Sequence, residues 1–385
     1  MDRPIYLDYN ATTPIAPEVV DAMLPYLRAE FGNPSSSHVY GTAAHVGVEQ
    51  ARQQVSDLIG CQPDEIVFTG AGSEANNLAI KGVAFARRDR SDRCDHLITS
   101  AVEHPAVLNT CMYLVERFGF QLTVLPVDSM GQVDPDAVRR AIRPSTALVT
   151  VMHANNETGT IQPIAEIAAL LRERGVPFHT DAAQSVGKIP TRVDDLGVDL
   201  LTIVGHKLYA PKGIGALYVR HGTKLDSLVH GAGHEGGRRA GTENVPYMVA
   251  LGTTCALASE RLAAGGAERI CALRDRLHAR LQDGVPGLTL NGHPERRLPN
   301  TLNVSFPGQD GEELLARTPA IAASTGSACH AGRTEPSGVL TAMGIPRGQA
   351  LGAVRLSLGH PTTADEIDAA ASALILSASS VPASR

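Results

Sequence analysis

Short apolar runs alternate with longer segments of helical periodicity through the first two thirds of the chain. The predicted strands are residues 65–69, 96–100, 147–152, 176–180, 200–204 and 215–219. Helices are predicted at residues 74–86, from Pro105 onward, and at residues 164–171, where Gly175 follows as a stop signal. This alternation predicts an α/β fold, with a mostly parallel sheet covered by helices on both faces.

The pattern changes near Leu257. A long arginine-rich helix is predicted from Glu260 to Leu281, followed by short strands and a terminal helix. We therefore expect a second, smaller α+β domain to begin near this point, as the length of 385 residues also favours.

Composition narrows the class of protein. The net charge of −6 is mild and no run of Lys or Arg occurs, so a nucleic-acid partner is not expected. The N-terminus lacks a secretory pattern, and no apolar stretch approaches the ~18 residues that span a bilayer, so we expect a cytoplasmic protein without a membrane partner. The scattered cysteines and histidines lack ligand spacing, which predicts reduced thiols and no metal site.

Polar residues follow the predicted strands at the point where each strand ends. They are Gly72 and Ser73, His104, Asn156, Asp181, and His206 with Lys207. Because the carboxyl ends of parallel strands line one crevice, these residues are expected to meet in one site. Each also has a structural interpretation: Ser73, His104 and Asp181 suit helix caps, and Lys207 suits a surface lysine.

The chemistry of this set favours one cofactor. Gly72 and Ser73 offer N–H groups and a hydroxyl to a phosphate at a helix N-terminus. Asp181 supplies a carboxylate for a protonated ring nitrogen, and His104 a ring for stacking or proton transfer. Lys207 supplies an amine whose pKa would fall on burial, as an imine-forming lysine requires. The set predicts a pyridoxal 5'-phosphate site.

Several segments carry a family resemblance across nearly the whole chain. They are residues 6–14 (YLDYNATTP), 32–36 (GNPSS), 155–159 (NNETG), 181–184 (DAAQ), 205–207 (GHK) and 326–329 (GSAC). With these motifs the chain resembles the fold-type-I pyridoxal-phosphate enzymes of the class V aminotransferase group, which includes cysteine desulfurases and selenocysteine lyases. The resemblance implies a large cofactor domain (16–258), a small domain (1–15 and 259–385) carrying the catalytic cysteine loop, and a homodimer with its active site at the interface.

The resemblance also implies residue roles. Lys207 matches the imine-forming lysine, His104 the stacking histidine that assists proton transfer, and Asp181 the partner of the pyridine nitrogen. Gln184 matches the donor to the ring oxygen of the cofactor, and Asn156 and Arg355 match residues that orient the substrate. Gly72, Ser73 and His206 match phosphate-binding positions. Thr242 matches a residue that contacts the phosphate bound by the other subunit.

Cys329 resembles the nucleophilic cysteine that takes sulfur as a persulfide. It lies in a stretch of small residues, and the nearby His330 and Arg333 would favour its thiolate. One departure from the family is Val204, where housekeeping desulfurases usually carry a serine that bonds the phosphate.

The expected function is the removal of sulfur from L-cysteine, which gives L-alanine and a persulfide for an acceptor protein. The nearest alternative is selenocysteine lyase acting on L-selenocysteine. A sulfur-relay scaffold without turnover, or an ordinary aminotransferase or epimerase, are further alternatives, although the last two would have no use for Cys329.

Overall fold

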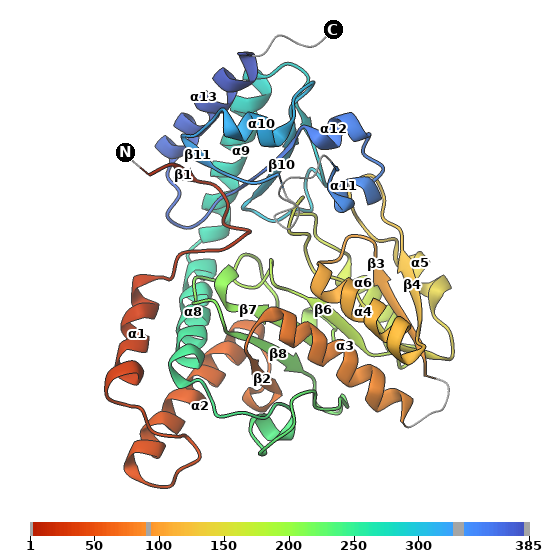
Figure 1. Cartoon of the computed structure of the whole chain (residues 1–385), viewed down its shortest axis with the longest axis vertical. Coiled ribbons are helices and arrows are strands. Elements are labelled where there is room, and N and C mark those ends of the chain that lie inside the picture. Colours follow the sequence, from red (N-terminus) through yellow and green to blue (C-terminus); the bar gives the residue numbers. More distant parts are fainter. Residues whose placement is uncertain (1–2, 90–93, 326–334, 381–385) are drawn as a thin grey trace.

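A seven-stranded sheet forms the centre of the larger part of the molecule (Figure 1). The computed structural model describes residues 3–89, 94–325 and 335–380. The strands, in spatial order, are β2 (Ile66–Thr69), β8 (Gly215–Val219), β7 (Leu200–Val204), β6 (Phe178–Asp181), β5 (Thr146–Thr150), β3 (His96–Ser100) and β4 (Gln121–Leu125). Only β8 runs antiparallel to its neighbours, so the predicted mostly parallel α/β fold is confirmed.

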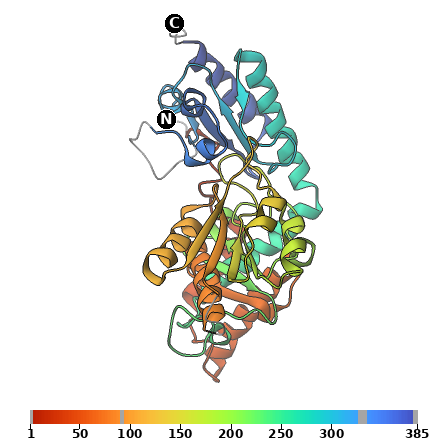
Figure 2. The ribbon, with the colours of Figure 1, turned by 90° about the vertical axis from the view of Figure 1, so that its right-hand side faces the viewer.

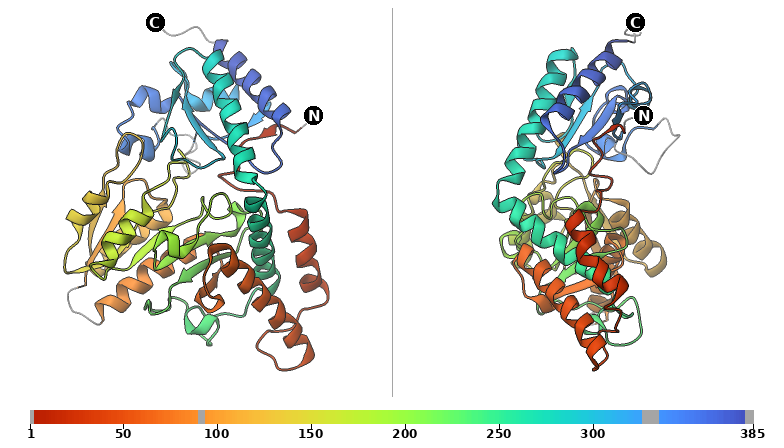
Figure 3. Two further views of the ribbon diagram at one scale, coloured as in Figure 1. Left: turned by 180° about the vertical axis from the view of Figure 1, so that it is seen from behind. Right: turned by 90° about the vertical axis from the view of Figure 1, so that its left-hand side faces the viewer.

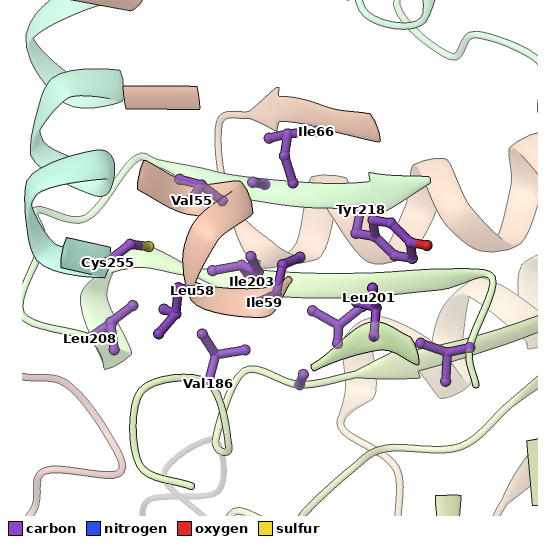
Figure 4. Close-up of a cluster of buried hydrophobic side chains, with 14 of the residues drawn as sticks. Val55, Leu58, Ile59, Ile66, Val186, Leu201, Ile203, Leu208, Tyr218 and Cys255 are labelled. Carbon is purple, nitrogen blue, oxygen red and sulfur yellow. The ribbon is translucent and has the colours of Figure 1, made fainter. Parts of the chain in front are cut away.

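Helices cover both faces of this sheet, and every strand except the edge strand β4 is buried along its whole length. Along β2, Ile66 and Phe68 face one hydrophobic cluster and Val67 faces another, as the two-residue period of a strand requires. The first cluster packs beneath α2 (Val39–Ile59), α6 (Ile164–Arg172) and α8 (Val245–Ala263), and Figure 4 shows part of it. The second packs beneath α3 (Gly72–Arg88) and α4 (Pro105–Phe118).

Three further helices flank the larger part. They are α1 (Pro17–Arg28), which packs on α8, and the short helices α5 (Pro135–Ala141) and α7 (Val193–Leu196), which pack on α6.

A second unit stands beyond one edge of the first, with its own hydrophobic core (Figure 2). Its antiparallel sheet has the order β12 (Ala353–Ser357), β10 (Thr301–Ser305), β9 (Thr289–Leu290). Its helices are α9 (Gly266–Gly284), α10 (Gly311–Ala316), α11 (Gly338–Ala342), α12 (Arg347–Leu351) and α13 (Ala364–Ser379).

The N-terminal segment belongs to this second unit by its pairing. Strand β1 (Ile5–Tyr6) pairs in parallel with β11 (Ile321–Ala322), and Asp8 bridges to Ser357. The domain division after residue 258 stays our proposal, and it falls inside α8.

The arginine-rich helix predicted from Glu260 to Leu281 is wrong as a single element. Helix α8 ends at Ala263 and α9 begins at Gly266, with Gly265 at φ 75° between them. Glycine accepts this left-handed conformation without strain, which permits the break. The two helices follow one another from the larger to the smaller unit (Figure 3). No helix of the described residues is both long enough and apolar enough to cross a membrane.

Candidate active site

Lys207 ends the short 3-10 helix η2 (Gly205–Lys207), which follows β7 directly. Its Nζ donates to the main-chain oxygens of Asn10, at 2.7 Å, and Ala11, at 2.6 Å. Burial, and next the charge of Arg355, lowers the pKa of Lys207 from 10.5 to about 8. A substantial neutral fraction near physiological pH is the state that a nucleophilic amine needs.

Asp181 ends β6, the neighbour of β7. It is only 6% exposed. Its Oδ2 accepts from Asn76 Nδ2 at 2.7 Å, and its Oδ1 from Ala183 N at 3.0 Å. Because a carboxylate offers about four acceptor positions, these two bonds fix the group and leave capacity for another donor.

His104 caps α4, so its structural interpretation is correct. Its Nδ1 accepts from Ala106 N at 3.1 Å. Burial lowers the pKa of His104, the charge of Lys207 acts in the same direction, and the charge of Asp181 opposes both. The ring is therefore held neutral, with its hydrogen on Nε2. These influences also place His104 in the electrostatic neighbourhood of Asp181 and Lys207, so capping does not preclude a second role.

The start of α3 contacts the end of β7. A Cβ at Gly72 would lie 2.3 Å from Val204 Cγ2, so the valine methyl group packs directly on this turn. Val204 thus fills this space with a methyl group and offers no hydroxyl there. Ser73 follows at an exposed position. His206 Nδ1 lies 3.2 Å from Thr12 Oγ1, and burial lowers the pKa of His206 to about 4.

Arg355 projects from β12 of the second unit and is 2% exposed. Its Nη1 donates to the main-chain oxygen of Asn156 at 3.0 Å, and its Nη2 to Asp8 Oδ1 at 2.7 Å. Its Nε is buried, and no described residue forms a hydrogen bond with it. Sequence reasoning had not singled out Asp8, although it lies within the YLDYNATTP motif.

Gln184 forms hydrogen bonds with Asn10 and Lys188, two residues that the sequence analysis did not select. Its Nε2 donates to the main-chain oxygen of Asn10 at 3.1 Å. Lys188 Nζ donates to Gln184 Oε1 at 2.9 Å and to Asn10 Oδ1 at 3.0 Å. The available signal was that Lys188 is one of only five lysines and lies four residues after Gln184.

One predicted site residue, Thr242, is not brought to this cluster by hydrogen bonds within the described part of the chain. Thr242 is exposed in the segment before α8, and no hydrogen bond joins it to the other described site residues. Cys329 lies outside the described residues. Among the residues that the structure describes, no group of three or more His, Cys, Asp or Glu side chains is arranged to hold a metal ion.

The family profile described as aminotransferase class-V matches residues 5–370. The chain belongs to the class V aminotransferase family. It is 47% identical over 370 residues to the cysteine desulfurase IscS of Dictyoglomus turgidum, covering 96% of this chain and 93% of that protein. It is also 46% identical over 369 residues to the cysteine desulfurase of Homo sapiens, covering 95% and 80% respectively.

Solved structures agree with this membership. A NifS-like protein has a TM-score of 0.91 at 35% identity, covering 98% of this chain and 100% of that one. A structure titled SspA in complex with cysteine has a TM-score of 0.80 at 40% identity, covering 92% and 98%.

Proposed function

We propose that this class V family member is a cysteine desulfurase. It removes sulfur from L-cysteine, giving L-alanine and a persulfide on Cys329 that passes to an acceptor protein. The single observation that supports this most is the environment of Lys207, a lysine at a strand end whose pKa is lowered to about 8 beside Asp181 and His104. The similarity to proteins named cysteine desulfurase supports L-cysteine as the substrate.

The cofactor in this proposal is pyridoxal 5'-phosphate, and the donor set fits it. Asp181, fixed by two hydrogen bonds, has acceptor capacity left for a protonated ring nitrogen. The start of α3 at Gly72 and Ser73, with His206, would take the phosphate, and His104 would stack on the ring. When bound, the cofactor supplies an electron sink for the substrate.

Arg355 is the proposed holder of the substrate carboxylate, together with Asn156. Its buried Nε has no hydrogen-bond partner among the residues that the structure describes, and an unpaired buried donor is costly unless a ligand satisfies it. The hydrogen bond from Arg355 on β12 to the main-chain oxygen of Asn156 also supports a carboxylate site between the two units.

The sulfur step is assigned to Cys329. Its thiolate attacks the substrate sulfur, an S–S bond forms and the substrate C–S bond breaks. The electron pair of that bond stays with the carbon, which gains a proton to become the methyl group of alanine. Three of the other thiols suit this role less, because burial raises the pKa of Cys61 and Cys111 to about 12 and also raises that of Cys255.

The active form is proposed to be a homodimer in which Thr242 reaches the phosphate bound by the partner subunit. Its exposed position, and the absence of a hydrogen bond from it to the other site residues that the structure describes, support this assignment.

The test is alanine release from L-cysteine with excess thiol reductant. Cys329→Ala is compared with Cys271→Ala, a control because Cys271 is a free thiol that is only partly buried. We expect release by the natural protein and the control, and its collapse in Cys329→Ala. Equal activity of all three proteins would refute the cysteine assignment. Inactivity of all three proteins would refute L-cysteine as the substrate. The same assay on L-selenocysteine would then test the selenocysteine lyase alternative.

A further inference from the structure

Lys188 places a second ammonium group beside the active-site lysine. As a residue it is partly exposed, but its Nζ bonds two interior side chains, Asn10 and Gln184, which are 1% and 4% exposed. The amine therefore lies inside the protein, where its hydrogen bonds must compensate for lost hydration. Burial, and next the charge of Lys207, lowers the pKa of Lys188 to about 7, so the amine is an ammonium group for only part of the time near neutral pH. Catalysis as proposed above does not use it directly.

The hydrogen bond from Lys188 fixes the orientation of the Gln184 amide, with its oxygen toward Lys188. An ammonium group only donates, so the atom it contacts must be the amide oxygen. The amide nitrogen is thereby turned toward Asn10, whose main-chain oxygen takes one of its two hydrogens. One N–H of Gln184 remains unused for an acceptor at the site.

Asn10 connects this pair to Lys207, and every one of its polar atoms is bonded. Its main-chain oxygen accepts from both Gln184 and Lys207. Its Oδ1 accepts from Lys188 and from Asn300 Nδ2 at 3.0 Å. The other atoms bond three more groups: Nδ2 donates to Asn156 O and Thr301 Oγ1, and the main-chain N to Ser357 Oγ. Asn10 cannot turn without breaking several of these bonds at once.

We propose that Lys188 is a positioning residue, whose ammonium group fixes the Gln184 amide and the Asn10 side chain so that Gln184 presents an N–H to the ring oxygen of the cofactor and Asn10 holds Lys207. The proposal rests on the function proposed above. It assigns to Lys188 no contact with the substrate or the cofactor.

The first test replaces Lys188 by methionine, which keeps the length and apolar stem but removes the donors. Lys224→Met is the matched control, because Lys224 is exposed and outside the site. The readout is the pH midpoint of the visible absorption band of the cofactor-loaded protein, with kcat and KM measured alongside. Loss of a donor to a charged ring oxygen should raise the midpoint by roughly one pH unit. The kcat should fall about tenfold with little change in KM, and Lys188→Arg should restore part of both effects.

A double-mutant comparison separates positioning from a general loss of charge or stability. If Lys188 acts through Gln184, Lys188→Met and Gln184→Ala should shift the midpoint in the same direction. Their combination should then shift it no further than Gln184→Ala alone. Additive shifts would overturn the proposal, as would a lower melting temperature with an unmoved band. Lys188→Gln serves if the methionine variant does not fold.

The two proposals fail differently. A natural protein without any visible band overturns the cofactor assignment and this inference with it. A natural protein with the band, whose band is unaffected in Lys188→Met, overturns this inference alone.

Discussion

The stability of the cofactor-free protein should depend on pH through Lys207. Its pKa is about 8 in the folded chain against 10.5 for an ordinary lysine, chiefly because it is buried. Below about pH 8 both states are protonated, and the folded state bears the full cost of the buried charge. Between about pH 8 and 10.5 the unfolded state holds more protons, so the free energy of unfolding rises with pH.

The shift from 10.5 to about 8, at about 1.4 kcal/mol for each pKa unit, corresponds to about 3 kcal/mol. Lys207 is partly exposed, and solvent screening reduces this to about 2 kcal/mol. Replacing Lys207 by methionine removes the pH-dependent part. It also removes the Lys207 donor from the main-chain oxygen of Ala11 and one of the two donors from that of Asn10, which adds a penalty that does not vary with pH.

The assay is urea unfolding of the cofactor-free protein from about pH 7 to about pH 10. Because the charge of Lys207 also lowers the pKa of Lys188, both chains should carry Lys188→Met, so that only Lys207 differs. As the pH rises across this range, the free energy of unfolding of the chain that retains Lys207 should increase by about 2 kcal/mol relative to that of the Lys207→Met chain. A difference that stays flat would refute the lowered pKa, and with it the argument that Lys207 is poised as a nucleophile.

Two further predictions concern packing and a buried ion pair. Gly72→Ala should lower the free energy of unfolding by about 1–3 kcal/mol, because the new Cβ would lie 2.3 Å from Val204 Cγ2. Adding Val204→Ala should recover most of that loss, and an unchanged stability in Gly72→Ala would contradict the contact. Glu235→Gln should cost about 3 kcal/mol or more, because it leaves Arg52, its partner at 2.9 Å, as a largely buried charge. Asp136→Asn, which breaks an exposed pair, is the control in the same urea assay and should cost much less; equal losses would contradict the role of burial.

Sequence reasoning worked best where burial on both faces leaves an unmistakable apolar run. The strands that become β5 and β7 were predicted, and so was the position of Lys207 immediately after β7. Strand β4 was missed because it is an edge strand whose residues are mostly exposed or half-buried.

The polar network around Asn10 could not be predicted in the same way. Its partners Gln184 and Lys188 come from a different part of the chain, and their bonds depend on tertiary proximity rather than on periodicity. A lysine near a site motif has no local signature that separates an inward from an outward ammonium. The break between α8 and α9 was missed although Gly265 stands there, because the helical pattern resumes immediately after it.

The hydrogen bonds of Asn10 also determine when, during synthesis of the chain, the active site can be completed. Asn10 leaves the ribosome early, whereas Ser357, to which its main-chain N donates at 3.0 Å, is made 347 residues later. In the sequence, the last strand of the larger sheet is β8, so all strands of that sheet are synthesised long before Ser357. Closing so long a loop adds little to the entropic cost because that cost grows only logarithmically with length. The surroundings of Lys207 are therefore completed last, so that a chain interrupted during synthesis has its sheet but not a finished catalytic centre.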